Sequence, residues 1–231
     1  MPLGLKERLY ADAGVVVLGT AGDDGLHIVP REHLSLSPEA VAVTLGRLLA
    51  LLRAWPIDLT AVVAVDRASL PLATVLAERL SLPRRPLSQL APDDRALLVL
   101  LAGRQAELLQ VVLEQSPPGT LSFVFALGWY EQHDLLPDII GVPVRDIAEA
   151  AAALEGSGDE PDATEELRSA CQSAAPEGNV EAQVRYYTQE HPRLRFLEAL
   201  MAAAGCRPPT HSARPDGTAG EETSGCTGRI E

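Results

Sequence analysis

Short, continuous apolar runs alternate with segments of helical periodicity over the first 150 residues, and this alternation constrains the fold more than any other feature. Continuous apolar runs are typical of strands that are covered on both faces. Helices of 10–15 residues between such strands favour a mostly parallel sheet with right-handed crossovers. The expected strands are 60–65, 96–102, 120–127 and 138–144. The predicted fold class is therefore α/β, with a mostly parallel twisted sheet flanked by helices.

The helices of this region have recognisable starts. Ser37 precedes Pro38, which is a serine cap followed by proline at the first helical position, and apolar residues recur from there to Leu52. Nearer the N-terminus, the apolar runs 15–19 and 26–30 flank a Gly-Asp-Asp-Gly break, which predicts a β-hairpin. The other expected helices are 3–12, 70–80, 104–115 and 145–154.

The pattern changes after residue 154, and this change sets the predicted domain boundaries. Residues 1–154 form the α/β domain, and the Gly-, Pro- and acid-rich stretch 155–161 is a linker. A helical extension follows over 162–204. Residues 205–231 have no apolar period and are expected to be a disordered tail. The expected helices of the extension are 162–173 and 179–203, and Pro192 divides the second into two helices or kinks it.

Acidic residues outnumber basic residues, which limits the classes of partner. Nineteen Lys and Arg residues against 32 Asp and Glu residues give a net charge of −13. This balance repels a phosphate backbone and an anionic membrane surface, so neither nucleic-acid nor membrane binding is expected. Lys6 is the only lysine in the chain, so a lysine Schiff base could form nowhere else. A cytoplasmic location is expected, because the three cysteines have no CxxC or zinc spacing and the N-terminus has no signal peptide.

The stretch VVAVDRASLPLATVLAERLSLP (62–83) resembles the type I phosphoribosyltransferases, and most of all the orotate enzymes. The resemblance covers residues 10–150 and depends on the order of elements and on the helix start Leu-Pro-Leu-Ala at 70–73. It implies that the loop after the first core strand holds the pyrophosphate of 5-phosphoribosyl-1-pyrophosphate through backbone N–H groups. Here Ala68 and Ser69 stand where the family has a glycine pair. The candidate ligand-binding residues of this loop are Asp66, Arg67, Ala68 and Ser69.

The second loop of the family carries two adjacent acids at the end of a strand, followed by a Thr- and Gly-rich turn that grips the 5-phosphate. By position, the acids fall at Leu100 and Leu101, which can neither bind ribose hydroxyls nor position Mg²⁺. The turn is reduced to Ala-Gly-Arg-Gln at 102–105, without threonine or serine. The candidate phosphate-binding residues of this second loop are Gly103, Arg104 and Gln105.

Three functional hypotheses follow. The first is a phosphoribosyltransferase-like protein without catalysis, which acts as a weak nucleotide- or phosphate-binding scaffold or as a protein-interaction scaffold. The second is an active enzyme that transfers 5-phosphoribose to a nucleobase such as orotate, with Asp66 binding ribose and Mg²⁺ accompanying the 5-phosphoribosyl-1-pyrophosphate. The third is another doubly wound interaction domain. The candidate partners are a phosphorylated small molecule and a second copy of the chain in a homodimer. No catalytic residue and no metal ligand is assigned.

Overall fold

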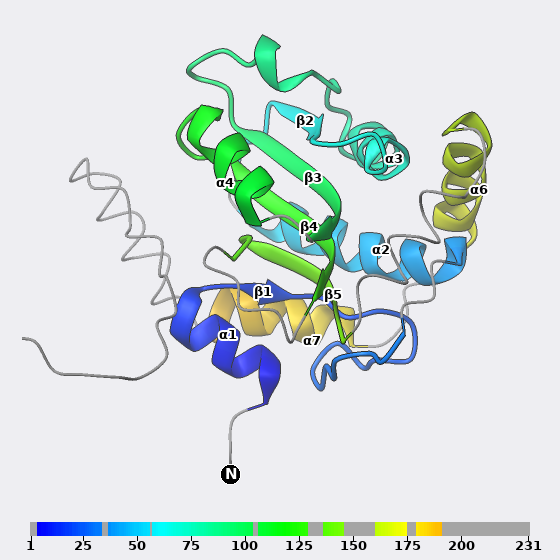
Figure 1. Cartoon of the computed structure of the whole chain (residues 1–231). Helices are drawn as coiled ribbons and strands as arrows, with labels where there is room; N and C mark the ends of the chain where they lie inside the picture. The colour runs from blue at the N-terminus through cyan, green and yellow to red at the C-terminus, as the bar shows by residue number, and fades with distance from the viewer. Residues whose placement is uncertain are drawn as a thin grey trace, which may run out of the picture.

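The computed structural model describes residues 4–33, 37–55, 57–103, 106–128, 136–145, 160–174 and 179–190. Its centre is a five-stranded sheet in the order β1-β5-β4-β3-β2, in which every neighbouring pair is parallel (Figure 1). This arrangement confirms the predicted α/β fold class. The strands are β1 (Val16–Val17), β2 (Ala61–Ala64), β3 (Ala96–Gly103), β4 (Leu121–Gly128) and β5 (Ile139–Val144).

The helices form where the sequence carries apolar periodicity and start signals. Ser37 caps α2, since its Oγ accepts a hydrogen bond from the Ala40 N–H at 3.3 Å, and Pro38 is the first helical residue. The described helices are α1 (Leu5–Ala13), α2 (Pro38–Ala54), α3 (Leu70–Leu80), α4 (Ala106–Gln115), α6 (Glu160–Ser173) and α7 (Val180–Arg185). A short 3-10 turn, η1 (Leu87–Gln89), and a π-helical turn, η2 (Tyr186–Glu190), complete the described elements.

The strands bury alternate residues in two layers. In β3, Leu97, Val99 and Leu101 belong to the core that α2, α3 and α6 cover. Leu98 and Leu100 point to the opposite face, where side chains of α4 cover them. Burial on both faces explains why the strands are apolar throughout.

The predicted hairpin at 15–30 is wrong. Residues 26–30 are not a strand, and β1 pairs in parallel with β5 instead. The acids of the Gly-Asp-Asp-Gly break use their side chains to bind the backbone donors of the loop. An Asp23 oxygen accepts the Thr20 N–H at 2.8 Å, and an Asp24 oxygen accepts the N–H groups of Leu26 and His27. The loop is therefore closed by local side-chain hydrogen bonds rather than by a second strand.

The C-terminal helices pack against the sheet domain over the part that the structure describes. α6 contacts α2 and α3, and α7 lies beside β1 and α2 (Figure 1). α6 begins at Glu160, two residues before the predicted start. The predicted helix 145–154, most of the linker 155–161, the end of the extension and the tail 205–231 lie outside the described residues. Within the described residues, no helix combines the length and the apolar character needed to cross a membrane.

A bidentate ion pair connects α6 to α3. Arg168 donates from Nε and Nη2 to the two carboxylate oxygens of Glu78, at 2.9 and 2.7 Å. Close by, Arg79 donates to the Cys171 carbonyl at 2.8 Å. The hydrogen bonds from Arg168 lower the pKa of Glu78 below its ordinary value of 4.5.

This pair predicts an acid dependence of stability. Because the pKa of Glu78 is lower in the folded chain, its stabilising effect is complete above pH 4.5 and is lost as the pH falls through the lowered value. We expect Glu78→Gln to be less stable than the parent at pH 7, by a small amount because the pair is partly exposed. Urea denaturation from pH 7 down to pH 3 should show the two proteins converging. A stability difference that stays constant over this pH range would contradict a stabilising ion pair between Glu78 and Arg168.

Candidate functional site

The carboxyl ends of the parallel strands meet at one edge of the sheet, which is where ligands bind in open α/β folds. Of the connections at this edge, the structure describes the turn 65–69 in full and the loop after β1 as far as residue 33. The loop 18–31 follows β1, and the turn 65–69 follows β2 and leads into α3. The turn contains all four predicted residues of the first ligand loop. Gly103, from the second predicted loop, ends the neighbouring strand β3, whereas Arg104 and Gln105 lie outside the described residues.

The turn after β2 is closed on itself. The Ser69 N–H donates to Asp66 Oδ1 at 2.7 Å, and the Ser69 hydroxyl donates to the Asp66 carbonyl at 2.9 Å. In return, the Asp66 N–H donates to Ser69 Oγ at 3.3 Å. The free N–H groups at helix N-termini attract anions in many proteins. At the N-terminus of α3, the Asp66 carboxylate already occupies this position.

The backbone of this turn also lacks the shape of an anion cradle. Among residues 66–69, all of which are described, none has a positive φ. Cradles built from successive N–H groups need the left-handed conformation that glycine provides. Ser69 is completely buried, whereas Arg67 and Ala68 are exposed. Arg67 is therefore the side chain of this turn that can meet an anion from solvent, through its forked N–H donors.

Leu100 and Leu101, the positions that the resemblance assigns to the family's acid pair, lie in the hydrophobic core. Leu100 is 2% exposed and packs on the α4 side of the sheet, and Leu101 is 3% exposed and packs on the α2 side. Neither position offers an oxygen to a ribose hydroxyl or to Mg²⁺. Among the described residues, no group of three or more His, Cys, Asp or Glu side chains could hold a metal ion. The described part of the chain therefore does not fit the magnesium site that the resemblance implies.

The adjacent acids Asp93 and Asp94 lie at the opposite, amino-terminal edge of the sheet. Asp94 accepts hydrogen bonds from the Thr60 hydroxyl, the Ala91 N–H and Arg85 Nη1, at 2.7, 2.7 and 3.0 Å. The Thr60 hydrogen bond is the largest cause of the lowered pKa of Asp94. These contacts tie the start of β3 to the segment before it, which is a structural role.

The loop after β1 contains a structural network that the sequence does not reveal. Arg47 of α2 is almost completely buried and donates to the Leu18 carbonyl at 2.9 Å and the Asp23 carbonyl at 2.6 Å. Arg31 donates to the Asp23 carboxylate at 2.9 Å. In the sequence, Arg47 only interrupts an apolar helical stripe, so no local signal identifies its partners. These contacts hold the loop firmly over the end of β1.

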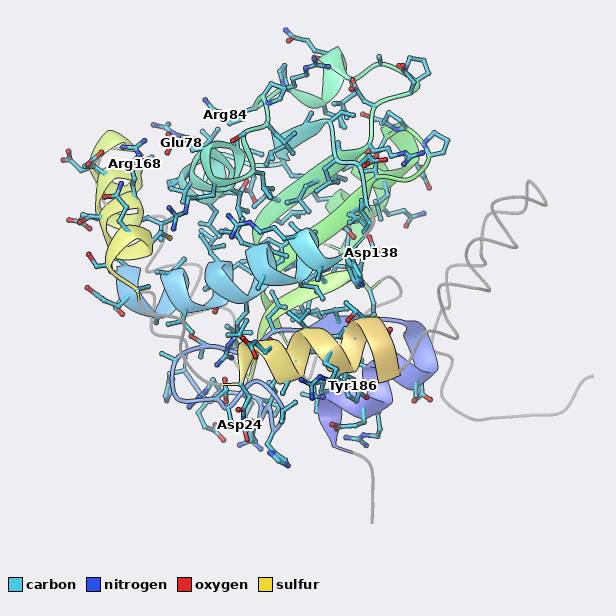
Figure 2. All side chains as sticks on the ribbon, turned by 180° about the vertical axis from the view of Figure 1, so that it is seen from behind. Asp24, Glu78, Arg84, Asp138, Arg168 and Tyr186 are labelled. Carbon is cyan, nitrogen blue, oxygen red and sulfur yellow. The ribbon has the colours of Figure 1, made fainter. Side chains whose placement is uncertain are left out.

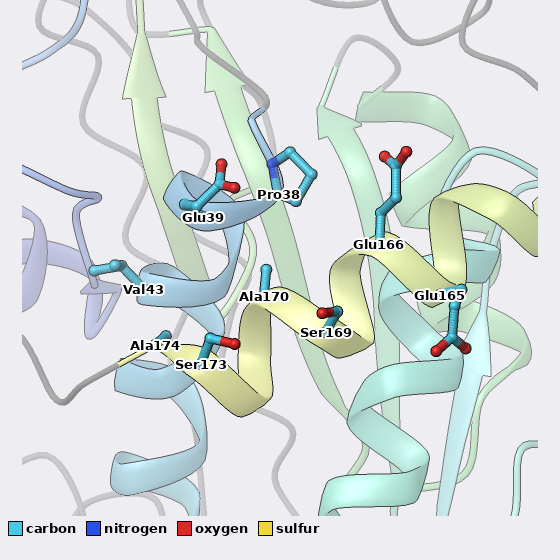
Figure 3. A pocket seen from close by; sticks show the side chains of 9 residues that line it. All are labelled: Pro38, Glu39, Val43, Glu165, Glu166, Ser169, Ala170, Ser173 and Ala174. Carbon is cyan, nitrogen blue, oxygen red and sulfur yellow. The ribbon is translucent and has the colours of Figure 1, made fainter.

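A cavity of about 680 Å³ lies between the first turns of α2 and helix α6 (Figure 3). Three of its described lining residues are acidic, namely Glu39, Glu165 and Glu166. Its described lining includes neither the turn 66–69 nor Gly103. A phosphate would meet negative charge there, so this cavity does not replace the predicted ligand loops.

Comparison with known proteins gives partial structural likenesses. No protein-family model and no curated protein sequence matches the chain. Among solved structures, the hypoxanthine-guanine phosphoribosyltransferase of Leishmania tarentolae in complex with GMP is 17% identical, with a TM-score of 0.37 over 50% of this chain and 85% of that one. The hypoxanthine phosphoribosyltransferase of Trypanosoma cruzi is 15% identical, with a TM-score of 0.36 over 48% and 81%. A hypoxanthine-guanine-xanthine phosphoribosyltransferase is 16% identical, with a TM-score of 0.37 over 48% and 78%. These three enzymes are named for purine bases, and the closer likeness to orotate enzymes stays a prediction from the sequence.

Proposed function

We propose that this chain is a phosphoribosyltransferase-like domain without transferase activity, which serves as a scaffold and binds phosphorylated small molecules only weakly. The proposal depends mainly on the burial of Leu100 and Leu101 in the core. By the resemblance, these are the positions where the family has its acid pair. In transfer of a phosphoribosyl group, positive charge develops on the ribose, and the enzyme must stabilise it and the departing pyrophosphate. Leucine side chains contribute nothing to either task.

The closed turn at 66–69 supports the same proposal. A pyrophosphate entering there would have to displace the Asp66 carboxylate from the Ser69 N–H, and the two negative charges would repel each other. Arg67 remains as an exposed contact for a phosphate. A single exposed arginine provides weak, salt-sensitive attraction rather than a tight site.

The second candidate function is an atypical transferase in which Asp66 binds the ribose. Asp66 does lie at the carboxyl edge of the sheet, directly after β2, and it is only partly buried. Its Oδ1, however, accepts the Ser69 N–H at 2.7 Å. An active site built on Asp66 would have to open this turn first.

A measurement of enzymatic turnover distinguishes the inactive scaffold from the atypical transferase. Pyrophosphate release from 5-phosphoribosyl-1-pyrophosphate with Mg²⁺ should be measured in the presence of orotate, hypoxanthine or guanine. We expect the rate with the protein to equal the rate without it for each base. Protein-dependent release that Asp66→Asn abolishes, with Asp93→Asn as the matched control at the far edge of the sheet, would establish the atypical transferase instead.

A further inference from the structure

The described end of the chain lies along the edge strand β1. Residues 180–190, which comprise α7 and η2 and are called the strap here, run beside β1 and α1 (Figure 2). Their second half is a π-helical turn, a rare conformation that is often found at functional positions. β1 is an outer strand of the sheet, and outer strands expose backbone groups that can pair with other chains.

Side chains of the strap take the place of a neighbouring strand. The Tyr187 hydroxyl accepts the Val17 N–H at 3.1 Å and donates to the Val17 carbonyl at 2.9 Å. Gln183 Nε2 donates to the Leu18 carbonyl at 2.9 Å. Val17 is the residue of β1 whose two backbone groups point away from β5, so one hydroxyl satisfies both of them. The strap therefore closes this edge of the sheet.

The only lysine of the chain holds the strap against α1. Lys6 is 2% exposed, and its Nζ lies 3.4 Å from the ring centroid of Tyr186 and 5.6 Å from that of Tyr187. The same ammonium group is 3.2 Å from a carboxylate oxygen of Glu7. The Tyr10 hydroxyl adds a hydrogen bond to the Tyr187 carbonyl at 3.3 Å. A buried ammonium on an aromatic face is held by the negative face of the ring, and this attraction strengthens as water is removed.

We propose that the strap is a releasable cover over the β1 edge and that the contact between Lys6 and Tyr186 is its latch. When the strap opens, the Val17 backbone groups and the Lys6 ammonium become accessible together. The backbone ladders between β3, β4 and β5 include no residue of the strap, so we expect these strands to remain paired in the open state. Local opening of this kind requires less free energy than global unfolding.

Hydrogen exchange tests the latch with matched pairs of variants. Tyr186→Leu removes the aromatic ring and Tyr186→Phe keeps it, while Lys6→Met removes the charge and Lys6→Arg keeps it. We expect the Val17 amide to exchange about 10-fold faster in Tyr186→Leu and in Lys6→Met than in the parent chain, whereas Tyr186→Phe and Lys6→Arg retain slow exchange. The amides of Leu98 and Val124 in the central strands should be unaffected in all four variants.

Acylation of Lys6 gives a second readout, since no other lysine is present. With an N-hydroxysuccinimide acetyl ester, peptide mass spectrometry should find Lys6 of the full chain much less reactive than a free lysine. Tyr186→Leu should accelerate acylation by the same factor as it accelerates Val17 exchange. Three results would overturn the proposal: unchanged Val17 exchange in Tyr186→Leu and Lys6→Met, equal acceleration of Val17 and the central amides, or full reactivity of Lys6 in the parent chain.

Discussion

Gly141→Ala is expected to destabilise the fold by about 3 kcal/mol, because the centre of the sheet has no room for a methyl group at this position. A Cβ atom on Gly141 would lie 2.4 Å from the carbonyl oxygen of Phe125 in β4 and 3.1 Å from its carbonyl carbon. The obstructing atoms belong to the backbone, so no side-chain rotation can relieve the overlap. The strands β4 and β5 would have to separate, and this would weaken their ladder of hydrogen bonds.

Gly46→Ala is the matched control for this prediction. Gly46 is an exposed residue inside α2, and a Cβ atom there would meet nothing within 4 Å. Alanine is the better helix former, so we expect this variant to be more stable than the parent by about 1 kcal/mol. Urea denaturation of both variants measures the difference. If Gly141→Ala were as stable as the parent, the close approach of β4 and β5 would be contradicted.

Tyr187→Phe is expected to destabilise the chain by about 2 kcal/mol, although it removes a single oxygen atom. Tyr187 is completely buried, and its hydroxyl is bonded to both backbone groups of Val17. Without the hydroxyl, the Val17 N–H is left buried and unpaired. Gln183 lies 3.3 Å from the Val17 carbonyl and can keep that acceptor partly satisfied. The main cost therefore comes from the N–H group.

Tyr10→Phe provides the comparison for this variant. It also removes one buried phenolic oxygen, which donates to the Tyr187 carbonyl at 3.3 Å rather than to the backbone of β1. We expect a smaller loss in the free energy of unfolding than for Tyr187→Phe. Equal losses in the two variants would mean that closing the β1 edge contributes no special stability.

The parts of the fold that depend on local pattern follow from the sequence. The predicted helix 70–80 corresponds to α3, and each of the predicted strands 60–65, 96–102, 120–127 and 138–144 overlaps an observed one. Continuous apolar runs identify these strands because both faces of the sheet are covered. The hairpin prediction failed because the apolar run 26–30 looks like a strand, while the partner of β1 is β5, more than 120 residues further along the chain.

The closure of the β1 edge could not be predicted, since it depends on contacts between residues far apart in the sequence. Gln183 and Tyr187 reach β1 from about 170 residues away, and an amphipathic helix pattern gives no sign of such partners. For the candidate site, the resemblance predicts that Leu100 and Leu101 stand at the positions of the acid pair, and the structure shows that both side chains are buried. The hydrogen bonds that close the turn between Asp66 and Ser69 depend on backbone geometry and only become visible in the structure.

Calorimetric titration with 5-phosphoribosyl-1-pyrophosphate, with and without Mg²⁺, is the sharpest test of our proposal that the chain has no transferase site. We expect weak binding, with a Kd of about 1 mM or higher, that is the same with and without Mg²⁺ and weakens further in Arg67→Ala. Arg84→Ala, which removes an exposed arginine away from the turn, should bind as the parent does. Micromolar binding that requires Mg²⁺ would overturn the proposal, because it would demand a set of acids at the carboxyl edge of the sheet that Leu100 and Leu101 cannot supply.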